Sequence, residues 1–149
     1  MTATRTPVVF VHGLWLHASS WAPWQERFAE AGYQSFAPGW PGDADSVEGC
    51  RADPDSIANH GIDDVTSHYV AFIDQLPARP IIIGHSFGGM IAEKLLGMDY
   101  GAGAIGIDAA QTDAITDLEE FDRGHSLIID SGWREVAEPC LNWLNKQGL

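Results

Sequence analysis

The sequence predicts an α/β fold: a mostly parallel sheet of about five strands with helices on both faces. Three observations predict it. Short runs of branched apolar residues, typical of buried parallel strands, recur along the 149 residues. Segments with apolar residues at helical spacing alternate with these runs. The composition, 45% hydrophobic and 19% charged, is that of one globular domain, which we expect to span residues 1–149.

The first part of the chain contains one predicted helix with one predicted strand before it and one after it. Residues 8–11 form a run of apolar residues and predict a buried strand. A helix is predicted over residues 21–31 and a second strand over residues 33–37. Residues 39–59 are rich in Gly, Pro and Asp without periodicity, and they predict a long surface loop. Loops of that length in compact domains are often functional.

The second part of the chain alternates between helices and strands. Its predicted elements are a helix over 62–76, a strand over 80–84, a helix through 90–96, strands over 104–108 and 116–121, and a helix over 133–146. Pro139 lies inside the last helix, where a proline costs about 3 kcal/mol or introduces a kink.

The charge of the chain excludes several classes of partner. Lys and Arg number 8 against 21 Asp and Glu, a formal charge of −13. Binding to nucleic acid or to an anionic membrane surface needs clustered Lys and Arg, so we expect neither. The N-terminal residues before the first apolar run are too few and too polar to form a signal peptide. No segment approaches the ~20 apolar residues that a membrane span needs. Both observations predict a cytoplasmic protein. Two cysteines, Cys50 and Cys140, are too few for a disulfide scaffold, and the sequence leaves open whether they pair.

Residues 84–88 match the pattern G-x-S-x-G directly after an apolar strand and before a helix. In that setting the glycines allow a turn that is too tight for side chains at the flanking positions. The turn lifts the Ser86 hydroxyl above the carboxyl edge of the sheet and strains its backbone. The N-terminus of the following helix favours negative charge that develops beside it. The pattern therefore predicts a nucleophile at Ser86.

A serine hydroxyl is a weak nucleophile unless a base takes its proton, and six histidines are candidates for this base. His125 follows the last predicted strand at the same sheet edge as the serine, so we expect it to be the base. We expect His12 to fix the turn after the first strand by hydrogen bonding, and the His85 side chain to point away from the serine. His60 and His68 are expected to be solvated.

The first predicted strand ends in His12 and Gly13, and a strand that ends in this way can turn its next backbone N–H toward the serine. The N–H of Leu14, or of Trp15 if the register differs, is predicted to form an oxyanion hole with the N–H of Phe87. The loss of one such donor typically lowers the rate by ~10²–10³-fold, so this feature matters nearly as much as the base.

Together these features resemble the α/β-hydrolase superfamily, and within it the small bacterial serine esterases. The resemblance rests on His12-Gly13, on residues 84–88 and on Gly124-His125 before the terminal helix, so it covers nearly all of the chain. It implies that the nucleophile precedes an acid, which in turn precedes the histidine.

The sequence departs from the family in one large respect, because a cap and one strand–helix unit are missing before the histidine. Only residues 109–115 join the last two predicted strands, which predicts a reduced fold without a cap domain. We expect the acid to be Asp108, since some family members place the acid at that position. Asp113 and Asp117 are weaker candidates, and Asp130 would break the family order. A role for Asp108 only at the end of its strand is an equally open interpretation.

The short connection also predicts an assembly. A parallel crossover normally needs a dozen or more residues, whereas residues 109–115 reach at most about 23 Å when extended. We therefore expect a homodimer that exchanges its C-terminal segment, so that His125 of one chain serves the serine of the other. A concentration-independent monomer mass in solution, with full activity, would exclude this arrangement.

The absence of a cap predicts an open site. Trp15, His17 and Trp40 are expected to line a substrate pocket, and Trp21 and Trp24 are further candidates, although core packing explains each tryptophan equally well. We expect no cofactor, and no metal site stands out because His12 and His17 lack a third ligand.

The predicted function is hydrolysis of small or medium carboxylic esters through an acyl-enzyme on Ser86, with His125 as general base. The alternative is a non-catalytic remnant of the fold that acts as a binding or oligomer-forming module. The missing strand and the uncertain acid motivate this alternative.

Overall fold

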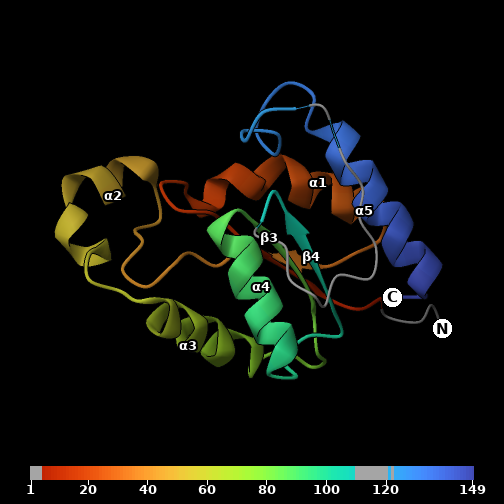
Figure 1. Cartoon of the computed structure of the whole chain (residues 1–149), viewed down its shortest axis with the longest axis horizontal. Helices are drawn as coiled ribbons and strands as arrows, with labels where there is room; N and C mark the ends of the chain where they lie inside the picture. Colours follow the sequence, from red (N-terminus) through yellow and green to blue (C-terminus); the bar gives the residue numbers. More distant parts are fainter. Residues whose placement is uncertain (1–4, 110–120, 122) are drawn as a thin grey trace.

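The computed structural model describes residues 5–109, 121 and 123–149. Within these ranges four parallel strands form one sheet with the order β2-β1-β3-β4 (Figure 1). The strands are β1 (Val8–Val11), β2 (Ser35–Phe36), β3 (Ile81–His85) and β4 (Gly103–Ile107). The fold is therefore an α/β fold with a parallel sheet, as predicted.

Helices connect the strands and cover the sheet. The α-helices are α1 (Ala22–Glu30), α2 (Val47–Ala52), α3 (Ile62–Ile73), α4 (Phe87–Gly97) and α5 (Arg134–Gln147), and the 3₁₀ helices are η1 (Ala18–Trp21) and η2 (Pro54–Ile57). In Figure 1, α1 and α5 lie on one side of the sheet, and α3 and α4 on the other. No helix in the described ranges is both long and apolar enough to cross a membrane.

Two hydrophobic cores follow from the alternation of side chains along the central strands. Val8 and Phe10 of β1 face the core under α1 and α5, whereas Val9 and Val11 face the core under α3 and α4. All four side chains are fully buried. A central strand of a parallel sheet is buried on both faces, which explains why β1 is a continuous apolar run in the sequence.

Two sequence predictions differ from the structure in the region before α3. The predicted strand over 33–37 is only two residues long, because β2 lies at the edge of the sheet and pairs with β1 alone. The predicted loop over 39–59 contains α2 and η2, so the prediction of an irregular segment was wrong there. Ser46 caps α2 by accepting a hydrogen bond from the Gly49 N–H at 3.0 Å, and Pro54 begins η2.

The C-terminal segment packs on the sheet of its own chain. Leu127 and Ile128 are buried in the core under α1, and Trp24 of α1 donates a hydrogen bond to the Ile128 carbonyl at 2.9 Å. The helix α5 continues through Pro139, with its apolar face in the same core. The predicted strand over 116–121 lies outside the described residues except for Phe121, which is not in a strand.

Candidate active site

Ser86 occupies a strained turn between β3 and α4. Its backbone angles are φ 56° and ψ −120°, which a residue with a side chain rarely adopts. A Cβ built on Gly84 would lie 1.9 Å from the Gly88 carbonyl oxygen, and a Cβ on Gly88 would lie 2.2 Å from that of Val11. Only glycine fits at these two positions, because the first turn of α4 lies directly against β1 and β3.

Strained residues follow three of the four strands at this edge of the sheet. Trp15 has φ 66° beyond β1, Ser86 has φ 56° after β3, and Asp108 has φ 50° after β4. Strain of this kind persists only where the surrounding structure enforces it, and it clusters at active sites and ligand clamps. The carboxyl edge of the sheet is therefore the candidate site, as expected for an open parallel sheet.

The turn after β1 lies directly beside Ser86. A Cβ built on Gly13 would lie 3.2 Å from the Ser86 Cβ, so a larger residue would crowd the hydroxyl. Within the part of the chain that the structure describes, the N–H groups of Leu14 and Phe87 make no backbone hydrogen bond. Their side chains are 45% and 38% exposed, so they leave an open apolar surface around the serine.

Asp108 and His125 come together from distant segments. The carboxylate Oδ2 of Asp108, directly after β4, makes a hydrogen bond with Nδ1 of His125. Within the described ranges, the other ring nitrogen of His125, Nε2, makes no hydrogen bond. Among the described residues, the Ser86 hydroxyl makes no hydrogen bond to either of them, although catalytic hydrogen bonds are often completed only when substrate is bound.

His85 lies between the Ser86 turn and the His125 segment. Its ring is 2% exposed, its Nε2 lies 2.8 Å from the His125 carbonyl oxygen, and the centroids of the two rings are 4.8 Å apart. Burial lowers the pKa of the His85 imidazole, and the hydrogen bond to the His125 carbonyl opposes this shift only in part. His85 thus contacts the segment that carries His125, a contact that the sequence analysis did not foresee.

His12 fixes the turn after β1 by hydrogen bonds, as predicted. Its Nδ1 lies 2.8 Å from the Gly13 carbonyl oxygen, and its Nε2 lies 2.8 Å from Oδ2 of Asp43. Trp40 stacks on the His12 ring, and its indole N–H donates to the His12 carbonyl at 3.1 Å. Burial raises the pKa of Asp43, but hydrogen bonds from His12 and from the Trp40 N–H together bring it below its usual value.

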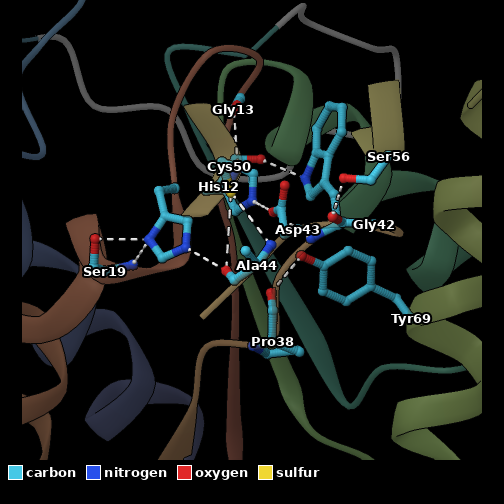
Figure 2. Close-up of polar contacts among 12 residues, drawn as sticks. His12, Gly13, Ser19, Pro38, Gly42, Asp43, Ala44, Cys50, Ser56 and Tyr69 are labelled. Atoms are coloured by element: carbon cyan, nitrogen blue, oxygen red, sulfur yellow. Dashed lines mark hydrogen bonds and ion pairs between the residues drawn. The ribbon is translucent and has the colours of Figure 1, made fainter. Parts of the chain in front are cut away.

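Figure 2 shows how this network ties the end of β1 to the segment before α3. Tyr69 of α3 donates to the Pro38 carbonyl at 2.8 Å, and the Ser56 hydroxyl of η2 lies 2.9 Å from the Gly42 carbonyl. Asp43 is the centre of the network, and the sequence analysis missed it. The only indication was that a buried histidine needs a partner for its second nitrogen.

The predicted pocket residues lie in different environments. Trp15 is 90% exposed, whereas Trp40 is half-buried against His12. Trp21 and Trp24 pack around Phe10 in the core, so the suggestion that they wall a pocket was wrong.

His17 uses both of its ring nitrogens. Nδ1 lies 2.8 Å from the Ser19 hydroxyl and Nε2 2.9 Å from the Ala44 carbonyl oxygen. The side chain lines an open cavity of about 420 Å³ together with Pro38, Gly39 and Asp43. Within the described ranges Ser86 is not part of the lining of this cavity.

Three potential metal ligands also come together at the site, although the sequence indicated none. One ligand atom each from His85, Asp108 and His125 lies within 4.8 Å of the others. Hydrogen bonds already join His125 to Asp108 and to His85. The three residues lie in separate segments, so no spacing in the sequence could have indicated the cluster.

A parallel α/β sheet with a serine on a strained strand-to-helix turn defines the class of α/β hydrolases. The chain belongs to the α/β hydrolase family, whose sequence profile matches residues 8–146. A search of curated proteins gave no match.

Solved structures with this fold are longer or similar in length. An extracellular α/β-hydrolase from a Paenibacillus species superimposes with a TM-score of 0.58 at 22% identity, covering 73% of this chain and 43% of that one. A monoacylglycerol lipase from Paleococcus ferrophilus has a TM-score of 0.58 at 26% identity, covering 70% of this chain and 40% of the lipase. A CIB-like hydrolase from Thermoplasma acidophilum has a TM-score of 0.74 at 17% identity, covering 98% of this chain and 89% of that protein. The chain spans less than half of the first two proteins.

Proposed function

We propose that the chain is a serine hydrolase that cleaves small or medium carboxylic esters through an acyl-enzyme on Ser86. The observation that carries the proposal is the geometry of the sheet edge: Ser86 lies on a strained turn, and a paired Asp108 and His125 lie beside its neighbour His85. Membership of the α/β hydrolase family supports hydrolase chemistry. The names of several structural neighbours, among them the monoacylglycerol lipase, favour esters as substrates.

In the proposed reaction, the Ser86 hydroxyl oxygen attacks the ester carbonyl carbon while its proton passes to Nε2 of His125. Asp108 holds Nδ1–H of the same ring and stabilises the imidazolium that forms. The N–H groups of Leu14 and Phe87 bind the negatively charged oxygen of the tetrahedral intermediate. The intermediate then collapses, and the leaving alkoxide takes the proton from Nε2 and departs as the alcohol.

Water completes the proposed cycle. His125 Nε2 takes a proton from the water as its oxygen adds to the acyl carbon. When this second intermediate collapses, the proton returns to the Ser86 oxygen and the carboxylic acid leaves. Trp15, His17 and Trp40 remain proposed contacts of the substrate, and Trp15 is 90% exposed.

Covalent labelling by a fluorophosphonate tests the nucleophile and the base. We expect the intact chain to be labelled, and the label to disappear in both Ser86→Ala and His125→Ala, because the reagent reports a serine activated by a base. Intact mass of the labelled protein is the measurement. Ser67→Ala, at an exposed position on α3, is the matched control and should be labelled like the parent chain.

An intact chain that resists the reagent, while circular dichroism shows it folded, would favour the alternative of a non-catalytic remnant. The exchanged homodimer remains a proposal that solution mass tests. In the described chain, the His125 side chain already meets its own Asp108.

A further inference from the structure

We propose that His85 is a positioning residue that holds the backbone of His125 and thereby sets the place of the His125 ring relative to Ser86. The effect of this positioning on the reaction rests on the proposed function. The contact itself is a property of the fold and can be measured without any activity.

The contact links the strand directly before the serine to the backbone of His125. His85 is the last residue of β3, and its Nε2 lies 2.8 Å from the His125 carbonyl oxygen. A carbonyl oxygen only accepts hydrogen bonds, so the His85 ring carries its proton on Nε2. Because β3 is central and its side chains are buried, the donor is fixed in place by the sheet.

The environment of His85 favours a neutral ring with a single proton. The other ring nitrogen, Nδ1, is buried without a hydrogen-bond partner among the described residues, so a second proton there would be a buried donor without an acceptor. Nδ1 faces the turn after β1, since a Cβ built on Gly13 would lie 3.5 Å from it. The one N–H of the neutral ring therefore donates to the His125 carbonyl.

A neutral ring at this place suits the proposed chemistry. The ring centroids of His85 and His125 are 4.8 Å apart. A positive charge on His85 would oppose the imidazolium that forms on His125 during proton transfer. His85 thus supports the general base without competing for the proton.

The other contacts of the segment hold residues on either side of His125, among them the Gly124 carbonyl, which accepts from the Leu127 N–H at 3.1 Å. The Ile128 carbonyl accepts from the Trp24 indole, and Arg123 forms ion pairs with Asp130 and Glu135. The Asp108 carboxylate holds the ring of His125 but not its backbone. In the described part of the chain, His85 is the only residue that donates to the His125 carbonyl.

Replacements of His85 separate the hydrogen bond from the bulk of the ring. In His85→Gln the side-chain amide reaches about as far as Nε2 and can donate to the His125 carbonyl. In His85→Asn the amide stops near the place of Nδ1 and cannot reach it. His85→Leu fills the space without any donor. We expect the rate of Ser86 labelling to fall by about 10²-fold in the Asn and Leu variants, and the Gln variant to recover most of it.

Two further readouts distinguish positioning from a general structural role. With a chromogenic ester, the loss should appear in kcat with KM little changed. In the His125→Ala background, His85→Asn should lower the residual rate no further, because His85 acts through His125. An equal loss in both backgrounds would overturn the proposal, as would a Gln variant as slow as the Asn variant.

Nuclear magnetic resonance of the histidine rings tests the contact independently of catalysis. Both His85→Asn and His85→Gln remove the ring that lies 4.8 Å from the His125 ring, so the two variants are compared with each other. We expect the ¹⁵N and ¹H resonances of the His125 ring to lie farther from their parent positions in His85→Asn than in His85→Gln. Equal His125 resonances in the two variants would overturn the inference. If the parent chain resists the fluorophosphonate but the resonances shift as expected, the proposed function fails and the contact stands. The Gln and Asn pair also decides the matter if the Leu variant does not fold.

Discussion

Asp108→Asn is expected to lower kcat for ester hydrolysis by about 10⁴-fold while the chain stays folded. The Asp108 carboxylate accepts a hydrogen bond from Nδ1–H of His125. An amide at this place can offer its N–H instead, which favours the wrong tautomer and leaves Nε2 protonated and unable to act as a base. Steady-state hydrolysis of a p-nitrophenyl ester measures the loss, and the near-ultraviolet circular dichroism checks the fold.

The other candidate acids are the matched controls. Asp113→Asn and Asp117→Asn change acids that lie outside the described residues, and both should leave kcat close to that of the parent chain. Asp130→Asn removes the negative charge that pairs with Arg123 but keeps an oxygen that can accept from the Gly132 N–H, so its effect should fall on stability rather than on kcat. A large fall in kcat in any of these three, with Asp108→Asn unaffected, would assign the acid elsewhere.

The sequence was informative wherever one local rule determines the structure. Residues 8–11 form β1 as predicted, because a strand buried on both faces needs a continuous apolar run. The turn at Ser86 was also predictable, since the strand, the two glycines and the helix all require the same tight bend. The role of His12 was predictable in the same way, because it lies at the end of a strand and is followed by a glycine, where its side chain can hydrogen-bond to the turn.

The sequence was less informative where the structure depends on distant partners. The segment over 39–59 has no hydrophobic periodicity, because α2 and η2 have no buried residue and are held by caps and by contacts such as Ser56 with Gly42. Asp43 could not be distinguished from neighbouring acids before its contact with His12 was known. A carboxylate that meets a histidine across a sheet edge leaves no pattern in the spacing of either residue.

The site itself combines the two cases. The position of Ser86 follows from residues 84–88 together with the strand before them and the helix after them. The pairing of Asp108 with His125 depends instead on the path of the chain between them. The position after β4, which some family members use for the acid, suggested this pairing, and the structure brings the two side chains into contact. The contact of His85 with the His125 carbonyl had no counterpart in the sequence, because a backbone acceptor is present at every residue.

Gly84→Ala is expected to unfold the chain or to lower its free energy of unfolding by more than about 4 kcal/mol, among the largest effects of a single substitution. The added methyl group would lie 1.9 Å from the Gly88 carbonyl oxygen and 2.6 Å from the Gly89 nitrogen. These are backbone atoms in the first turn of α4, so they can move only if the helix moves away from the sheet. Such a movement would open both hydrophobic cores and displace Ser86. Urea unfolding followed by far-ultraviolet circular dichroism measures the change.

Gly97→Ala provides the matched control at the other end of the same helix. A Cβ built on Gly97 meets no described atom within 4 Å, and the residue lies in α4 with a φ that is not positive. The same substitution should there stabilise the chain by about 0.4–1 kcal/mol, because alanine restricts the unfolded chain more than glycine does. The opposite signs separate the close approach of α4 to β3 from the general helix preference of alanine. An unfolding midpoint of Gly84→Ala equal to that of the parent chain would mean that α4 does not pack as closely against β3 as in the structure. The close approach of α4 could then not explain the strained backbone of Ser86.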